Sequence, residues 1–597
     1  HYSLDLEFEN DEIISGATVQ RDGRRTLDDL LGWLDQNHEK RFFIWAHFFD
    51  PHLPYTPPEP YSTLYALDPY SGEVAYTDAL VGELVDKLDA LGHESDTIVA
   101  IVGDHGESRG DHDEKYHGLF IYDSTLQVPF LLRAPGIPHG KIEDQVRIID
   151  IMPTLLDLLH MESPSFKQGE GLVKGQSLTP LLYGAEKSLN LLAYSESHYP
   201  KLHYGWSNLL SLRSGRYKYI QAPRPELYDL SSDPRELQNL IDTRPEIAAR
   251  MRQNLEELGR CAGRAALNES EPAKGDVQTA EALRALGYTG SVSPGTQKEG
   301  ETLADPKDKI DLLNRLEQAE RLIASGEPSR AIPLIEQVVK EEPQMTDARI
   351  SLGVALIKIN DFPSAAHVFE QILEYDGANF IALMNLGMCR QRLGQETAAQ
   401  ELFTQAIAVE PTHQKAVDTL VDSYLRSGRM KEAVSACERF LELKPESIPI
   451  RVRLARSLFN MGRTRDAKKT VEKGLEMNSA GADLNYLMGK IWEDRGKYEE
   501  AAEAYGAELR HHKNNADAYQ SLASVLERSK AWDKIIPLLE EGTAEHPEHF
   551  PCHLLLARAY FNTGNDHEKA VATARRALEL NPSSQEARSL LEALQEK

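Results

Sequence analysis

The feature that most constrains this chain is a turn residue that recurs every 34 residues through its second half. The spacing between successive glycines there is either 34 or twice 34 residues. A fixed period of this length indicates stacked units, each of which buries its apolar face against its neighbours. The two positions skipped by the glycines are Asn360 and Lys530, where a turn also fits. The glycines of the series are Gly326, Gly394, Gly428, Gly462, Gly496 and Gly564.

Small residues recur with the same period, five residues after each turn, and prolines follow many of the units. Small side chains let paired helices approach closely, glycine closes the turn between them, and proline stops the second helix. This pattern resembles the tetratricopeptide repeat. We expect eight helix pairs from about Ile310 to Asn581, followed by a polar capping helix from Ser583 to Glu596. The small residues are Ala331, Ala365, Ala399, Ala433, Ala467 and Ala501.

An array of this kind forms a curved scaffold with a concave face. The functional interpretation is docking of a peptide or protein partner. A spacer or an oligomerisation element is the alternative, and no sequence feature names a ligand.

The first half of the chain carries a different signal, an apolar run that ends abruptly in polar residues. Residues Ile98–Val102 are rich in β-branched side chains and predict a buried parallel strand. Asp104 and His105 follow directly, on a turn flanked by Gly103 and Gly106. Because the chemistry of open α/β sheets lies beyond the carboxyl ends of their strands, the carboxylate and imidazole look like metal ligands. The pattern suggests a hydrolase.

The elements around this strand alternate between helix and strand before they become short strands alone. This order predicts an α/β core with a smaller antiparallel C-terminal part. The expected helices are Thr26–Gln36, Glu73–Leu91 and Met152–Leu159. The expected strands are Arg41–Phe48, Ile98–Val102, Val128–Arg133, Val146–Ile149, Leu189–Ser195, Leu209–Arg213 and Tyr217–Ile220.

Composition excludes several classes of protein. The chain has 597 residues and a formal net charge of −28, which argues against nucleic acid as a partner because nucleic-acid binders present a basic face. No apolar run approaches the roughly 20 residues needed to span a bilayer. The four cysteines form no CxxC pair, so we expect small buried side chains and no disulfide framework or zinc cluster. They are Cys261, Cys389, Cys437 and Cys552.

Several motifs of the first half, in their shared order, resemble the sulfatase family over roughly residues 20–290. That family belongs to the alkaline-phosphatase-like superfamily, so the resemblance implies its α/β fold. The segment His47–Tyr55 resembles the family's Pro-His-x-Pro-Tyr segment, and Tyr76–Gly82 its helix before the metal strand. The remaining matches are Asp104–Glu107, His117–Gly118, Tyr122–Asp123, Val128–Pro129, Leu212–Arg213, Tyr217–Ile220, Glu226–Glu236 and Asn239–Leu240.

The resemblance implies roles for four residues. Asp104 and His105 would bind a divalent metal, with calcium preferred to manganese or magnesium because the family commonly uses it, although a histidine ligand favours a transition ion. His52 and His117 would contact the sulfate group or donate a proton to the leaving oxygen. The implied substrate is a sulfate ester.

A second group of residues is less strongly indicated. His47 and Asp50 belong to the same motif as His52, and Asp50 is a candidate for orienting His52 or His47. For His112 and Lys115, solvated loop positions are the favoured interpretation. The acidic stretch Glu226–Glu236 is expected to be a strand and turn that pack on the core, rather than a metal site.

One part of the family pattern is missing. Sulfatases carry an early Asp-Asp metal pair and a Cys/Ser-x-Pro-x-Arg motif whose Cys or Ser becomes formylglycine, and this chain contains no such motif and thus no nucleophile. The first residue is His1, and only about 45 residues precede the His52 segment, so we expect an N-terminally truncated catalytic domain with its formylglycine upstream. The expected boundaries are residues 1–288 for that domain, 289–305 for a linker and 306–597 for the repeat array.

The sequence is compatible with three functions. The first is a metal-dependent sulfatase whose repeats bind a protein partner. The second is a phosphodiester or phosphonate hydrolase or transferase of the same superfamily, and the third is a catalytically inactive interaction scaffold. Export or a periplasmic location is favoured by the resemblance alone.

Overall fold

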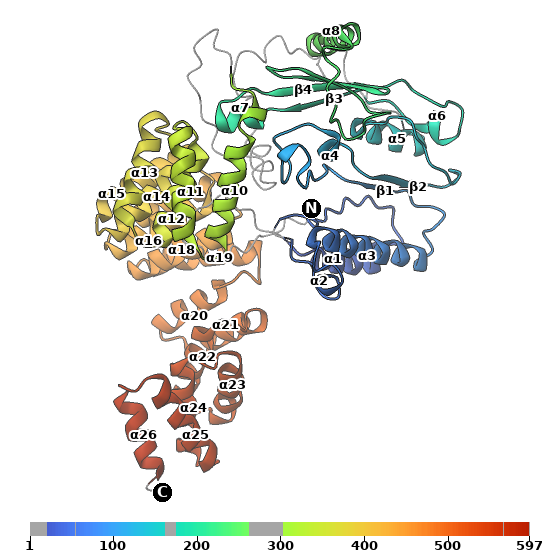
Figure 1. Ribbon diagram of the computed structural model, residues 1–597. Coiled ribbons are helices and arrows are strands. Elements are labelled where there is room, and N and C mark those ends of the chain that lie inside the picture. The colour runs from blue at the N-terminus through green and yellow to red at the C-terminus, as the bar shows by residue number, and fades with distance from the viewer. Residues whose placement is uncertain (1–20, 54, 162–174, 262–302, 565, 596–597) are drawn as a thin grey trace. The chain divides into compact units, whose positions relative to one another are not determined.

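The computed structural model describes residues 21–53, 55–161, 175–261, 303–564 and 566–595 (Figure 1). The chain divides into two compact units, His1–Val368 and Phe369–Lys597. The first contains an α/β region and the first helices of the repeat array, and the second contains the remaining repeats. Most of the predicted linker 289–305 lies outside the described residues, so the predicted domain boundaries stay predictions.

The α/β region begins with helices that pack on one another. Leu27 of α1 contacts Tyr76 and Leu80 of α3 in a small apolar core. The Asp22 side chain caps α1 by accepting the Arg24 amide, and Asp68 caps α3 in the same way at Ser71. These helices are α1 (Gly23–Asn37), α2 (Tyr61–Leu64) and α3 (Pro69–Ala90).

Strand β1 (Val99–Val102) pairs with β2 (Phe130–Arg133) in antiparallel register, with Val102 opposite Phe130. The prediction of a buried parallel strand was therefore wrong. The chain leaves β1 and enters β2 at the same end of the pair, whereas a parallel pairing needs a crossover back to the opposite end. Among the described residues no third strand joins this pair, so alternate side chains of β1, including Val102, are exposed.

Short elements surround this strand pair. The expected strand over Val146–Ile149 was wrong: the Asp150 carboxylate accepts the Arg147 amide and caps a 3-10 turn there. The segment Arg41–Phe48 has no ladder partner and forms no regular strand. The short elements are η1 (Asp111–Asp113), α4 (Asp123–Leu126), η2 (Ile148–Asp150), α5 (Ile151–Leu158) and α6 (Thr179–Leu182).

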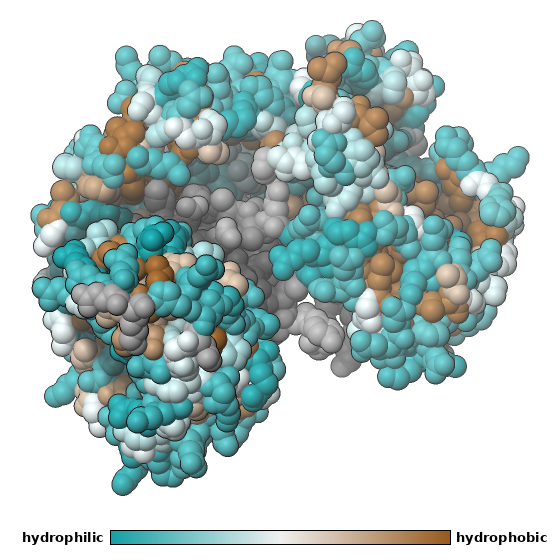
Figure 2. Space-filling view, turned by 90° about the horizontal axis from the view of Figure 1, so that it is seen from below, coloured by the Kyte–Doolittle hydropathy of each residue, from teal (hydrophilic) through white to brown (hydrophobic). Residues whose placement is uncertain are grey.

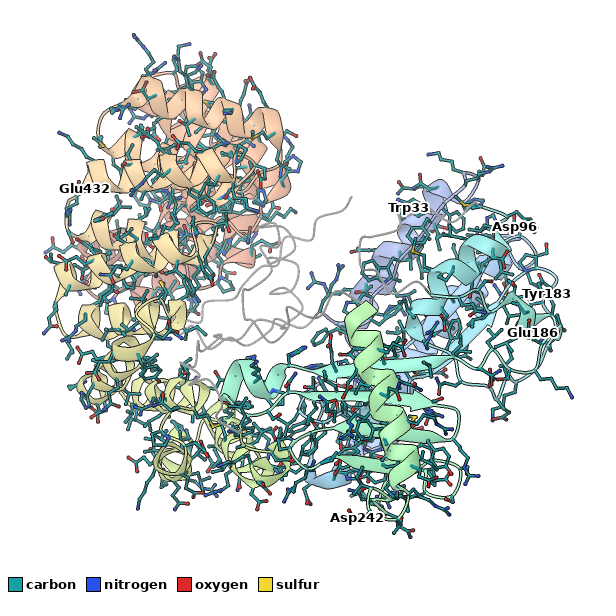
Figure 3. All side chains as sticks on the ribbon, turned by 90° about the horizontal axis from the view of Figure 1, so that it is seen from above. Trp33, Asp96, Tyr183, Glu186, Asp242 and Glu432 are labelled. Atoms are coloured by element: carbon teal, nitrogen blue, oxygen red, sulfur yellow. The ribbon has the colours of Figure 1, made fainter. Side chains whose placement is uncertain are left out.

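A four-stranded antiparallel sheet in the order β3-β4-β5-β6 confirms the predicted antiparallel C-terminal part. Leu212, Tyr219 and Leu227 on one face pack against α8, which lies over the sheet in Figure 1. Its elements are β3 (Leu192–Ser197), α7 (Tyr199–Tyr204), β4 (Leu209–Ser214), β5 (Tyr217–Gln221), β6 (Glu226–Asp229) and α8 (Pro245–Cys261). Figure 3 shows Tyr183 and Glu186 together in the loop before β3, and Asp242 just before α8.

The second half forms the predicted eight helix pairs, followed by a capping helix. Every one of the eight turns between paired helices places a residue at positive φ, including Asn360 at 62° and Lys530 at 57°, the two positions where glycine is absent. The periodic alanines are fully buried where the helices of a pair meet. Cys389, Cys437 and Cys552 are free and buried, as expected, and the side chain of Cys261 lies outside the described set.

Within residues 303–564 and 566–595, the array begins with η4 (Pro306–Asp308), and sixteen paired helices and a cap follow. The helices are α10 (Ile310–Ala324), α11 (Pro328–Glu341), α12 (Thr346–Lys358), α13 (Phe362–Tyr375), α14 (Phe380–Arg392), α15 (Glu396–Val409), α16 (Gln414–Arg426), α17 (Met430–Leu443), α18 (Ile448–Asn460), α19 (Thr464–Met477), α20 (Leu484–Asp494), α21 (Tyr498–His511), α22 (Ala516–Arg528), α23 (Trp532–Glu545), α24 (Phe550–Thr563), α25 (His567–Leu580) and the cap α26 (Gln585–Gln595).

The surface is mostly hydrophilic on the face shown in Figure 2, with scattered hydrophobic patches. None of the helices in the described ranges combines the length and the apolarity that crossing a bilayer would require.

Two glycines in one helix pair give a matched test of the packing. A Cβ at Gly489 would lie 2.5 Å from Tyr505 Cε1, whereas one at Gly506 would meet nothing within 4 Å. We expect G489A to destabilise the array by about 1–3 kcal/mol through overpacking. We expect G506A to stabilise it by roughly 0.5–1 kcal/mol because alanine is the better helix former. Urea unfolding of both variants measures the difference, and shifts of the same sign would contradict this account.

Candidate functional site

The candidate site lies where β1 ends and gathers residues from three separate motifs. The His105 and His117 ring centroids are 4.0 Å apart, and those of His52 and His117 are 5.6 Å apart. Phe49 also contacts His52, at 4.5 Å between ring centroids. The fold thus brings together the three histidines to which the resemblance assigns metal-binding or catalytic roles, although 65 positions separate His52 from His117.

Asp104 and His105 occupy the turn directly after β1. The Asp104 carboxylate accepts the His105 amide at 2.9 Å, and its side chain is 69% exposed. His105 Nδ1 lies 2.9 Å from the Gly106 carbonyl oxygen, so the tautomer that donates this bond leaves the lone pair on Nε2. Nε2 lies 3.8 Å from Asp104 Oδ2, so both atoms can bind the same cation.

This turn requires a glycine after His105. A Cβ on Gly106 would lie 2.4 Å from the Ser124 carbonyl oxygen, and the Gly106 amide donates to the Thr125 oxygen at 2.7 Å. The Gly103 amide continues the ladder by donating to the Pro129 oxygen at 3.1 Å. The turn is therefore held tightly against α4 and the start of β2.

Helix α3 fixes the segment that carries His52. Glu73 is buried, and its two carboxylate oxygens accept the His52 amide at 3.0 Å and the Thr56 amide at 2.7 Å. Thr77 donates to the Asp50 carbonyl oxygen at 3.1 Å. Burial lowers the pKa of His52, and its Nδ1 lies 2.9 Å from the Leu53 carbonyl oxygen. Sequence reasoning missed Glu73, which reads as one more charge on an amphipathic helix.

His117 is paired with a carboxylate. Its Nδ1 lies 3.2 Å from Glu107 Oε2, and the Glu107 side chain is only 5% exposed. Burial acts to lower the pKa of His117, but the hydrogen bond and charge of Glu107 outweigh it and raise that pKa above its ordinary value. Glu107 was part of the motif that carries Asp104, yet its role as the partner of His117 emerges only from the fold.

The residues of the second group lie elsewhere. The Asp50 carboxylate accepts the Gly23 amide at 3.0 Å, which ties the start of α1 to this segment. The His47 ring lies 6.3 Å from that of Phe49. His112 stacks on Tyr122 at 3.5 Å, so the expectation of a solvated loop position was wrong for it. Lys115 is exposed, as expected, and acts electrostatically on Glu317 of α10.

A buried ion network joins the start of α4 to the antiparallel sheet. Lys218 of β5 is 1% exposed, and its Nζ lies 2.8 Å from both Asp123 Oδ1 and Glu236 Oε1. Arg213 Nη1 contacts the other Asp123 oxygen at 2.7 Å, and the Tyr122 hydroxyl donates to Glu226. The structure thus gives the Glu226–Glu236 stretch the packing contacts that were expected of it.

The metal expectation remains a prediction. In the described ranges, no group of three or more His, Cys, Asp and Glu side chains is placed to hold a metal ion. Asp104 and His105 have the donor chemistry for two positions of a divalent site, and further ligands would be needed to complete it.

Comparison with known proteins assigns the two halves. Residues 9–161 match the family described as Sulfatase, and residues 110–260 match the one described as N-sulphoglucosamine sulphohydrolase, C-terminal. Tetratricopeptide repeat families match residues 322–385, 381–413, 424–491, 493–534 and 526–594. The chain therefore contains a sulfatase-family region fused to tetratricopeptide repeats.

Curated sulfatases are similar to part of this chain. Arylsulfatase K of Bos taurus is 31% identical over 198 residues, which cover 32% of this chain and 36% of that protein. Choline-sulfatase of Rhizobium meliloti (strain 1021) is 32% identical over 178 residues, 29% of this chain and 32% of that protein. The chain thus spans about a third of the length of these relatives. A solved Bacteroides thetaiotaomicron structure from work on the metabolism of multiple glycosaminoglycans aligns at 22% identity with a TM-score of 0.33, over 40% of this chain and 54% of that one.

A buried carboxyl beside the site gives a pH prediction. Burial raises the pKa of Glu114 to about 7, although its carboxylate accepts the Leu119 amide at 2.8 Å and the Phe120 amide at 3.2 Å. The folded state then binds more protons than the unfolded state between about pH 4.5 and 7. The contribution of Glu114 to stability is complete below that window and is lost as the pH rises through it.

E114Q removes this titration and keeps an oxygen acceptor. We expect the difference in unfolding temperature between E114Q and the unmodified chain to favour E114Q more at pH 8 than at pH 5. Calorimetry of both proteins at the two pH values measures this difference. The exposed Glu143 supplies the control, because E143Q should leave the difference between the two pH values unchanged. A relative stability of E114Q that does not vary with pH would contradict the prediction.

Proposed function

We propose that this chain supplies the metal-strand turn and the anion-contacting histidines of a sulfuric ester hydrolase. The observation that carries the proposal is the convergence of His52, His105 and His117 beside Asp104, at ring separations of 4.0 and 5.6 Å. The matched sulfatase families and curated sulfatases support the same reaction class.

In this proposal Asp104 and His105 would hold a divalent metal, calcium before manganese or magnesium. Such an ion, when bound, polarises a sulfate oxygen and lowers the pKa of a nucleophile. The tautomer of His105 set by the Gly106 carbonyl leaves Nε2 for that ion, and the glycine turn keeps the Asp104 carboxylate beside it.

The histidines would act on the ester itself. His117, paired with the buried Glu107, is suited to hold a proton and to contact the sulfate anion. His52, fixed through its amide by Glu73, would contact the sulfate group or donate a proton to the oxygen that leaves. The nucleophile would be a formylglycine in residues that precede this chain. No Cys/Ser-x-Pro-x-Arg motif occurs within the chain itself.

The repeat array would bind a protein or peptide partner. The matched tetratricopeptide families and the eight stacked helix pairs support this part of the proposal.

The test uses the full-length protein with three variants. We expect D104A and H117A to lower turnover of 4-nitrophenyl sulfate by about 100-fold or more, because each removes a charge-stabilising or proton-transferring group. H139A is the control, since His139 is an exposed loop histidine outside the cluster, and it should retain full turnover.

A substrate panel separates the alternatives. Bis(4-nitrophenyl) phosphate and an aryl phosphonate are assayed beside the sulfate ester. Dominant phosphodiester or phosphonate turnover would overturn the sulfatase chemistry while keeping the site. A folded protein that turns over none of the three substrates would favour the inactive scaffold instead.

A further inference from the structure

The first helix of the repeat array contacts the loop that carries His117. Helix α10 belongs to the same compact unit as residues 107–118. Asn314 Nδ2 donates to the Asp113 carbonyl oxygen at 2.9 Å, and Arg321 Nη1 donates to the Tyr116 hydroxyl. The Arg321 guanidinium carbon also lies 5.6 Å from the centre of the Tyr116 ring. Positions 314 and 321 are two helical turns apart, so one face of α10 reaches both ends of the segment 113–116.

This loop has a backbone that needs external support. Arg109, His112 and Asp113 have φ angles of 54°, 55° and 63°, and none of them is glycine. Left-handed conformations are unfavourable for a non-glycine residue, so they persist only where surrounding contacts hold them. The contacts of Asn314 and Arg321 fall within and just beyond this stretch, at Asp113 and Tyr116.

The segment leads directly into the candidate site. The Tyr116 carbonyl oxygen accepts the Ser108 amide at 2.8 Å, which joins the two ends of the loop. His117 follows Tyr116 and contacts Glu107, which directly precedes Ser108. A displacement of Tyr116 would therefore move the His117 ring relative to Glu107, His105 and His52.

A second set of contacts holds the start of the array in place. The Ser207 amide donates to the Ala304 carbonyl oxygen at 2.8 Å, and the Arg224 amide donates to Asp305 Oδ2 at 3.0 Å. His203 Nδ1 lies 3.1 Å from Asp347 Oδ2 on α12. These contacts involve α7, the β3–β4 loop and the turn before β6. They hold the segment before α10, and α12 after it, in place.

We propose that Asn314 and Arg321 of α10 are positioning residues for the loop bearing His117. The consequence for turnover rests on the proposed function, whereas the effect on the loop does not. Arg321 is exposed, and single exposed contacts contribute little to global stability. Loss of its contact should therefore loosen the loop without unfolding the chain.

Hydrogen–deuterium exchange on the full chain tests the positioning directly. In R321A and N314A we expect amides in peptides covering residues 108–118 to exchange at least about tenfold faster. Arg315 gives a matched control on the same helix, because it pairs with Glu341 of α11 instead of the loop. R315A should leave these peptides unchanged. Unchanged exchange in the double variant N314A/R321A would overturn the proposal.

Kinetics on the full-length protein test the catalytic consequence. We expect R321A to lower kcat for a sulfate ester about tenfold with a smaller change in KM, and R321K to recover part of the loss because it keeps a cationic donor. Y116F serves if R321A folds poorly, since it removes only the hydroxyl acceptor. Faster exchange with an unchanged kcat would overturn the role in catalysis. If the unmodified protein hydrolyses no sulfate ester, the proposed function fails, and the exchange experiment still decides the positioning.

Discussion

The geometry of the α/β region depends on one buried cation. Lys218 lies almost wholly out of solvent between Asp123 and Glu236, and its ammonium contacts a carboxylate oxygen of each at 2.8 Å. A buried charge is tolerated only when it is paired and hydrogen-bonded, so neither carboxylate can move away without leaving an uncompensated ion. The Asp123 amide also donates to Glu236 at 2.6 Å, which adds a main-chain contact to the ion pairs. The network therefore fixes where α4 begins relative to β5.

The candidate site depends on this fixed point. Gly106, directly after His105, packs against Ser124 and Thr125 of α4, so the turn that carries Asp104 takes its position from the same helix. Tyr122, just before α4, stacks on His112 and donates to Glu226. The turn after β1 and the loop bearing His117 are thus tied to the antiparallel sheet from both sides. Small displacements of that sheet would shift the histidines, because the contacts between them are short and directional.

The repeat array depends on a different constraint, which is local and repeated. Each of its eight turns needs one residue in the left-handed region, and each helix pair needs small residues where its helices meet. Because every unit contacts mainly its neighbours, the stability of such an array is close to a sum over units and interfaces. The first unit differs, since α10 also contacts the Tyr116 loop of the α/β region.

The sequence by itself determined the features that follow from short-range periodicity. The 34-residue spacing predicted all eight helix pairs and the cap, and the turn positions Asn360 and Lys530 were identified despite the absence of glycine. It also predicted the three strands β3, β4 and β5 within a few residues, and it singled out Asp104, His105, His52 and His117. Those predictions depend on local backbone preferences and on motif order, which a linear chain displays directly.

Tertiary structure alone decided how these pieces meet. The strand after Ile98 is antiparallel and half-exposed, because pairing partner and direction depend on how the chain returns. The roles of Glu73 and Glu107 as partners of His52 and His117, and the stacking of His112 on Tyr122, depend on contacts between distant segments. No single stretch of sequence contains that information, since hydrogen bonds and ring contacts are set by positions in space that only the packed chain defines.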